Sequence, residues 1–187
     1  MACTTLNNIL KTCDNNQGGV FQIYVNDTYN CQTTINSASH SISALSVSGA
    51  SFSTFQFNRN VGHLDVEPKI DLINGSTYYE AKVTLHFNRR EAVKSRALTI
   101  LAEGQRFLDL IIGDANGIYW YVDHAQLNGG AETTGTNRAD GSKYEVTFIA
   151  QMNTRPFTID LSLVTPVINI VSSPTIPTGN FDGNGPV

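Results

Sequence analysis

Two long extended segments joined by Asn-Gly constrain the fold of this 187-residue chain more than any other feature. The first segment runs from His63 to Ile73, the second runs from Ser76 to Phe87, and Asn74-Gly75 lies between them. Asn-Gly supplies the positive φ angles that a tight two-residue turn requires between antiparallel strands. The pattern therefore predicts a long β-hairpin that turns at Asn74-Gly75.

The two arms of this hairpin are expected to play different roles. Four apolar residues of the second arm alternate with polar ones and predict a core face at its far end: Ala81, Val83, Leu85 and Phe87. Tyr78 and Tyr79, at the near end, need not reach the core. Pro68 interrupts the first arm, and because proline cannot donate a ladder hydrogen bond, that arm is expected to be an edge strand or to contain a bulge. An edge is a place where another subunit can pair.

Further alternating segments predict a sheet of about eight strands. The expected segments are a strand over 21–25 with one buried face, a hairpin from 37 to 58 turning at Gly49, two strands over 107–112 and 118–122 around a turn at 113–117, and strands over 144–151 and 157–163. A Gly- and Thr-rich loop is expected from 128 to 141.

One α-helix is predicted after the long hairpin. Asn88 and Glu91 have the spacing of an N-cap with its capping-box partner. An apolar stripe then follows helical spacing and ends at Gly104: Val93, Ala97, Ile100 and Leu101. The sequence therefore predicts a mainly β chain in which a single helix packs on the sheet.

Length and composition are those of one domain. We expect an N-terminal arm or short helix over 1–19, where Leu6, Ile9 and Leu10 have helical spacing, a β-rich domain over 20–165, and an arm or flexible tail over 166–187. No apolar run of about 18 residues and no signal-peptide pattern occur, so the chain is expected to be soluble, without a membrane segment. With 15% charged residues, a net charge of −4 and no basic stretch longer than Arg89-Arg90, it lacks the footprint of a nucleic-acid-binding protein.

Residues with catalytic or ligand-binding chemistry are sparse. The chain contains no nucleophile elbow, no metalloprotease motif and no phosphate-binding loop, so we expect no enzyme, no catalytic residue, no cofactor and no metal site. Reduced thiols are expected for Cys3, Cys13 and Cys31, although a disulfide or a metal site remain alternatives. Four scattered histidines are read as exposed or interface residues: His40, His63, His86 and His124. Asp114 is read as a turn residue, since its segment lacks the ligand spacing of a calcium loop.

Tyr119-Trp120-Tyr121 allow two interpretations. Aromatic faces bind sugars and bases, so these three residues could form a stacking platform. On a strand, however, Tyr119 and Tyr121 share one face and Trp120 takes the other. A strand inside a sandwich or at a subunit interface accounts for all three.

The order of several segments resembles the tail tube and tail hub structural proteins of phages that infect Bacteroidetes, including the crAss-like phages. The resemblance rests on VTLHFNRR (83–90), ALTILA (97–102), LIIGDANGIYW (110–120), NGG (128–130), TG (134–135) and DGSKYEVTF (140–148). The segment 4–20, which leads into a first strand after Gly18-Gly19, is also similar to the start of such proteins. A long tail from Pro166 onward departs from the family and leaves open a repeating tube subunit, a single-layer hub or an adaptor.

The resemblance implies a tail-tube-like β-sandwich or split barrel, flanked by one helix, whose long protruding hairpin adds strands to neighbouring subunits. It further implies a homo-oligomeric ring, a hexamer or dodecamer, in a virion tail assembled in the host bacterial cytoplasm. Such a ring would contact other tail, ring or portal proteins, and DNA would pass through its bore without specific binding.

Two classes of function therefore remain. The first is a structural ring subunit, and the alternative is a β-sandwich that binds a receptor or glycan without catalysis. For the first class, the expected subunit-interface residues are Val66, Pro68, Ile70, Leu72, Asn74, Gly75, Tyr78, Tyr79 and Trp120.

Overall fold

The computed structural model describes residues 16–57, 61–103, 105–137 and 139–168. Among these described residues, strands account for 56% and helices for 15%, which confirms the prediction of a mainly β chain. The predicted N-terminal helical turn, Cys3, Cys13 and most of the predicted tail lie outside the described residues. No helix in the described part of the chain is long and apolar enough to cross a membrane.

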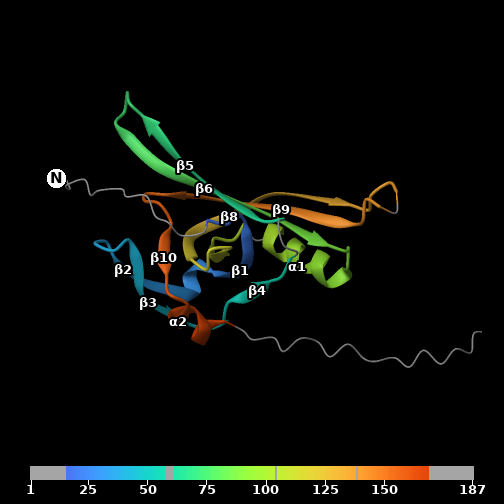
Figure 1. Ribbon diagram of the computed structural model, residues 1–187, viewed down its shortest axis with the longest axis horizontal. Coiled ribbons are helices and arrows are strands. Elements are labelled where there is room, and N and C mark those ends of the chain that lie inside the picture. The colour runs from blue at the N-terminus through green and yellow to red at the C-terminus, as the bar shows by residue number, and fades with distance from the viewer. Residues whose placement is uncertain (1–15, 58–60, 104, 138, 169–187) are drawn as a thin grey trace, which may run out of the picture.

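The described residues form ten strands and two α-helices (Figure 1). The strands are β1 (Val20–Asp27), β2 (Cys31–Asn36), β3 (Ser41–Val47), β4 (Ser53–Phe55), β5 (His63–Asp71), β6 (Ser76–Asn88), β7 (Leu108–Asp114), β8 (Tyr119–Thr133), β9 (Lys143–Met152) and β10 (Phe157–Ile159). The helices are α1 (Ala92–Glu103) and α2 (Leu161–Val164), and two short 3₁₀ turns cover η1 (Thr28–Asn30) and η2 (Thr165–Val167).

Strand β8 belongs to both parts of the sheet. Its first half pairs with β7 and β10 in the order β2-β3-β10-β8-β7-β1-β4, and its second half pairs with β9 in the order β5-β6-β9-β8. All pairs are antiparallel except β3 with β10, so the sheet is mixed. Across the described residues the strands do not close into a barrel.

Two hydrophobic clusters cover opposite faces of the central strands. The main cluster joins inward residues of β1, β7 and β8 to those of β6 and β9, and it includes the four predicted core residues of β6. The second cluster contains Tyr24, Ile111, Tyr119 and Tyr121 and lies against β3, β10 and α2. β1 is therefore buried on both faces, which contradicts the predicted single face. A bulge between Val20 and Gln22 leaves Phe21 42% exposed.

The predicted hairpin at Gly49 is wrong. β3 pairs with β2 and β10, whereas β4 pairs with β1 at the other end of the sheet order. Ile42 of β3 belongs to the second cluster, but Phe55 of β4 packs on the main cluster. The two flanking strands therefore pack in different hydrophobic clusters. Gly49 still turns the chain, with a φ of 93°.

Two predictions in the C-terminal half also need correction. Residues 128–133 lie in β8, and Gly129 to Thr133 pair with β9, so the predicted loop from 128 to 141 is confined to its second part. The predicted strand over 157–163 ends at Ile159, because the Asp160 carboxylate accepts the amide N–H of Ser162 at 2.8 Å and caps α2. A second, short helix thus replaces the end of that strand. The fold continues slightly beyond Pro166, since Ile168 forms a β-bridge with Phe52.

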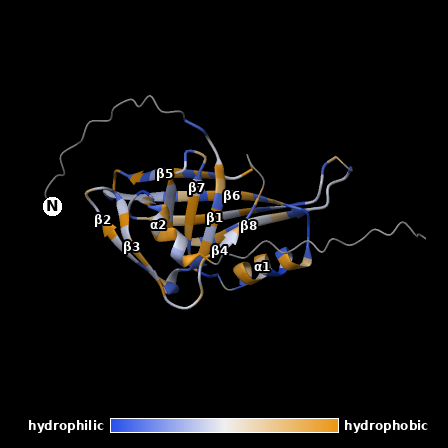
Figure 2. Ribbon diagram, turned by 60° about the horizontal axis from the view of Figure 1, so that its bottom comes forward, coloured by the Kyte–Doolittle hydropathy of each residue, from blue (hydrophilic) through white to orange (hydrophobic). Residues whose placement is uncertain are grey.

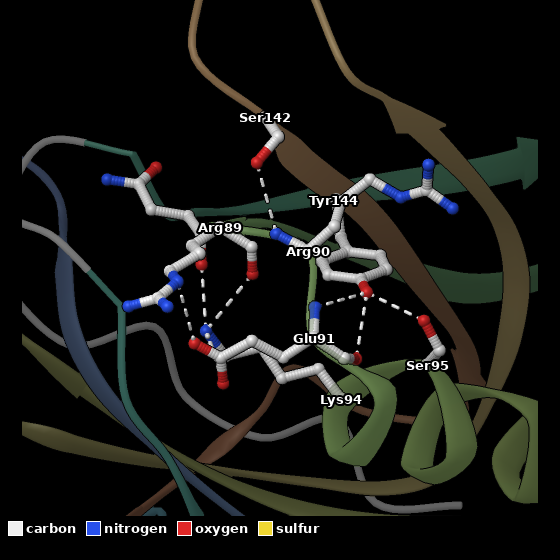
Figure 3. Close-up of polar contacts among 8 residues, drawn as sticks. Arg89, Arg90, Glu91, Lys94, Ser95, Ser142 and Tyr144 are labelled. Atoms are coloured by element: carbon white, nitrogen blue, oxygen red, sulfur yellow. Dashed lines mark hydrogen bonds and ion pairs between the residues drawn. The ribbon is translucent and has the colours of Figure 1, made fainter. Parts of the chain in front are cut away.

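Helix α1 exists as predicted, but its predicted cap does not. Asn88 is the last residue of β6 and pairs with Lys143, and the helix begins at Ala92. The buried Tyr144 hydroxyl takes the place of a cap: it accepts the Glu91 amide N–H at 3.1 Å and lies 2.7 Å from Ser95 Oγ (Figure 3). The core of β9 therefore fixes where α1 begins.

Removing this hydroxyl should weaken the start of α1. We expect Tyr144→Phe to lower the free energy of unfolding by about 1 to 2 kcal/mol, because the Glu91 amide and carbonyl lose a partner. Urea-induced unfolding would measure the change, with Tyr29→Phe at a residue 79% exposed as the control. Equal stability of Tyr144→Phe and wild type would contradict this role.

Candidate assembly surface

The outer part of the β5–β6 hairpin extends beyond the rest of the sheet (Figure 1). β6 pairs with β5 from Ser76 to Thr84, but its pairing with β9 starts only at Tyr79. Residues 69–78 therefore pair only with one another among the described residues, and we call them the hairpin tip. The structure confirms the predicted hairpin and places its tip outside the hydrophobic core.

The tip turns through a four-residue loop, not the predicted two-residue turn. Asp71 pairs with Ser76, so residues 72–75 form the loop. The Asp71 carboxylate accepts the amide N–H groups of Ile73 at 2.9 Å and Asn74 at 3.2 Å, and also the Asn74 side-chain amide. These hydrogen bonds lower the pKa of the Asp71 carboxyl, and the bond from the Asn74 side chain has the largest effect. Gly75 supplies the one positive φ of the loop, at 64°.

Apolar side chains are exposed along this tip. Ile70 is 61% exposed, Leu72 is 89% exposed and Ile73 is 95% exposed. Single exposed apolar residues are common, but three within four positions of a projecting loop form a patch. Asn74 and Gly75 share the loop, and Tyr78 is 38% exposed opposite Lys69. These predicted interface residues are therefore brought together on one accessible surface.

β5 is an edge strand, as Pro68 predicted, and its pairing with β6 is continuous without a bulge. An exposed Pro68 offers no N–H to an incoming strand at the middle of this edge. The edge is also charged. Asp65, Glu67 and Asp71 alternate along it, and the Lys69 ammonium, 2.7 Å from Glu67, lowers the pKa of that carboxyl.

The remaining predicted interface residues lie at the base of the hairpin. Val66 and Trp120 both line a groove of about 550 Å³ between β5 and the β7–β8 turn. Trp120 is half-buried and its indole N–H donates to the Asp114 carboxylate at 3.0 Å. Tyr79 is half-buried beneath Arg155, whose guanidinium carbon lies 5.4 Å from the ring centroid. Val66, Tyr79 and Trp120 therefore do not belong to the exposed patch of the tip.

The three-residue aromatic platform is not available as a binding surface. Tyr119 is 9% exposed and Tyr121 is 3% exposed, and both lie in the second hydrophobic cluster. Trp120 faces the opposite way and packs against the main cluster. The alternating arrangement predicted for a strand inside the sheet is thus confirmed.

Helix α1 presents a second apolar surface, which sequence analysis assigned to the core. No residue of α1 is buried, and only Leu98 and Leu101 pack against the main cluster. Val93 is 79% exposed and Ile100 is 43% exposed, with Ala97 exposed between them. Figure 2 shows that α1 carries hydrophobic as well as hydrophilic residues. Together with the exposed Arg96, these three residues occupy helical positions i, i+3, i+4 and i+7, and we call them the α1 face: Val93, Arg96, Ala97 and Ile100.

Asp109 forms a buried polar group that sequence analysis did not identify. The residue is 2% exposed, and its carboxylate accepts hydrogen bonds from the hydroxyls of Thr28, at 2.6 Å, and Tyr121. Burial, together with the charge of Asp109, raises the pKa of the nearby Cys31 thiol to about 12. The Tyr121 pKa is raised for the same two reasons. Neutral hydroxyl donors thus satisfy a buried carboxylate, an arrangement that joins η1, β7 and β8.

The described histidines and carboxylates do not gather into a metal centre. No group of three or more His, Cys, Asp or Glu side chains suited to a metal ion occurs within the described ranges. His63 lies 3.4 Å from Asp65, His86 lies 3.8 Å from Glu145, and both pairs are on strand surfaces. The arrangement that stands out is therefore the pair of exposed apolar surfaces at the hairpin tip and on α1.

No model of a known protein family matches the chain, and a search of curated proteins also finds no match.

The Cys31 thiol should react as a poorly ionised group. In a Cys3→Ser, Cys13→Ser variant, we expect the rate with Ellman's reagent to rise about tenfold per pH unit from pH 8 to 10, because only the thiolate reacts and its fraction keeps growing below a pKa of about 12. The same variant unfolded in urea provides the control, and its rate should level off near pH 9 to 10. A folded-state rate that levels off at the same pH would contradict the raised pKa.

Proposed function

We propose that this chain is a structural subunit of a phage tail tube or tail hub, which assembles through its hairpin tip into a ring of identical copies. One observation carries the proposal. The tip lies outside the core and exposes Ile70, Leu72 and Ile73 to solvent. Covering one such side chain at an interface contributes roughly 1.5–3 kcal/mol, so the exposed tip favours association.

The form of association follows from where the tip lies. A tip that contacts a different surface of the next copy makes a head-to-tail contact, which closes into a ring or continues as a filament. Pro68 restricts the partner's backbone pairing to either side of it, so the tip side chains provide most of the contact. In this proposal, six or twelve copies joined by this head-to-tail contact close into a ring.

The assignment to a phage tail rests on the resemblance of six sequence segments. Of these, 110–120 forms the β7–β8 hairpin and 140–148 forms much of β9, and both contribute residues to the main cluster. In this proposal the ring lies in the virion tail after assembly in the host cytoplasm, next to other tail, ring or portal proteins. A weakly acidic chain lets DNA pass through the bore without binding it.

Removing the tip should separate folding from assembly. We expect wild-type protein to form rings in negative-stain microscopy, and a variant with Lys69–Tyr78 replaced by Gly-Ser-Gly-Ser to stay a folded monomer. The linker joins Pro68 to Tyr79, which lie opposite each other, and leaves the pairing of β6 with β9 intact.

Mass photometry would measure the oligomeric state, and Tyr29→Ser, at a residue 79% exposed outside the hairpin, is the matched control. A wild-type protein that stays monomeric at every concentration tested and binds a glycan would refute the proposed function. Loss of folding in the linker variant would place the tip in the core.

A further inference from the structure

The two exposed apolar surfaces lie at opposite ends of one strand. β6 has 13 residues, starts at the hairpin tip and ends four residues before α1. At about 3.3 Å per residue it spans roughly 40 Å. Figure 1 shows the tip and α1 on opposite sides of the molecule. Because β6 is held in the sheet by β5 from Ser76 to Thr84 and by β9 from Tyr79 to Asn88, the tip of one copy cannot reach the α1 face of the same copy.

The two surfaces carry opposite charge. The arm that leads to the tip has three carboxylates, Asp65, Glu67 and Asp71, against the single cation Lys69. Four of the chain's 12 Lys and Arg residues lie within 89–96, at the start of α1, in a protein whose net charge is −4. Opposite potentials of this kind steer association and fix its orientation.

The cations next to α1 are only partly neutralised within the chain. Arg90 lies 2.7 Å from Glu132. Arg89 and Lys94 share Glu91 at 3.4 and 3.6 Å (Figure 3). Arg96 forms no ion pair among the described residues and belongs to the α1 face. A carboxylate of a second molecule can therefore approach Arg96 without displacing a partner that the structure describes.

A groove beside α1 offers room for an apolar side chain. Its volume is about 260 Å³, and Ala97, Ile100 and Leu101 form its helical wall. Val25 and Phe55 lie on the side of β1 and β4. This groove is therefore continuous with the apolar part of the α1 face and suits aliphatic residues such as Leu72 and Ile73.

We propose that the hairpin tip of one copy docks on the α1 face of the next copy, with Leu72 and Ile73 in the groove beside Ile100 and the acidic edge of β5 facing Arg96. The proposal rests on the proposed function, because it names the receptor surface for the assembling tip. Each copy carries one tip and one α1 face, so the contact is head-to-tail. Every copy then covers the apolar surface of one neighbour and is covered by another.

Two complementary variants test this pairing. The tip variant carries Leu72→Asp and Ile73→Asp, and the helix variant carries Val93→Glu and Ile100→Glu, so both change exposed residues. We expect each variant alone to be monomeric and an equal mixture to form a one-to-one dimer, because the mixture retains one intact tip and one intact α1 face. Sedimentation velocity would measure the species, and circular dichroism would confirm folding.

Two further variants control the test. Ala102→Glu adds a negative charge to an exposed residue on the opposite side of α1 from Val93, out of i,i+3 and i,i+4 reach of Arg96, and it should assemble like wild type. Arg96→Glu keeps the apolar residues, and we expect it to weaken association at least tenfold and to remove its dependence on salt. Arg96→Glu decides the question if the helix variant does not fold.

The outcomes separate the two proposals. A helix variant or Arg96→Glu protein that assembles like wild type would refute docking on α1 and assign that face to another partner, while ring assembly would stand. Dimers in the helix variant alone would show that tips pair with tips, and dimers in the tip variant alone would show pairing of α1 with α1; either refutes the head-to-tail contact. A monomeric wild type refutes the proposed function itself.

Discussion

The pairing of β6 on both sides is the constraint on which the rest of the structure depends. From Tyr79 to Thr84 the strand lies between β5 and β9, and from Leu85 to Asn88 it pairs with β9; its inward side chains form much of the main cluster. Before Tyr79, β6 pairs only with β5 among the described strands. This difference sets the boundary between core and hairpin tip, and the direction of the strand places α1 at the far end. A single uninterrupted strand thus determines where both exposed apolar surfaces lie.

Local sequence patterns predicted where the strands lie better than they predicted which strands pair with one another. Alternation identified β6 and β9, because each of these strands has a core-facing side with period two, and the turns at Asn74-Gly75 and 113–117 identified β5 and β7. It could not show that β3 and β4 belong to different ends of the sheet. That choice depends on Ile42 and Phe55 packing in separate clusters, which is a contact between segments distant in sequence. The false cap at Asn88 has the same origin, since Tyr144 comes from another strand.

The candidate site was predictable in part for a similar reason. Turn residues and Pro68 identified the hairpin and its edge, and the exposed tip agrees with that reading. Val66, Tyr79 and Trp120 lie at its base because strand register, which the sequence does not fix, decides how far the core extends. The α1 face was assigned to the core because helical spacing of Val93, Ala97 and Ile100 is the same whether a sheet or a neighbour covers it. The burial of Asp109 and its hydrogen bond with Thr28 could not be predicted, because Thr28 is 81 residues away in sequence.

The shared strand β6 also determines how the protein resists mechanical force. If neighbours hold the tip and α1, tension between them runs along the covalent backbone of a strand that is already extended. The strand therefore cannot lengthen much, and the hydrogen bonds that pair ten of its residues with β9, from Tyr79 to Asn88, carry little of the load. The strand that separates the two surfaces is thus also a tether suited to an assembly under axial stress.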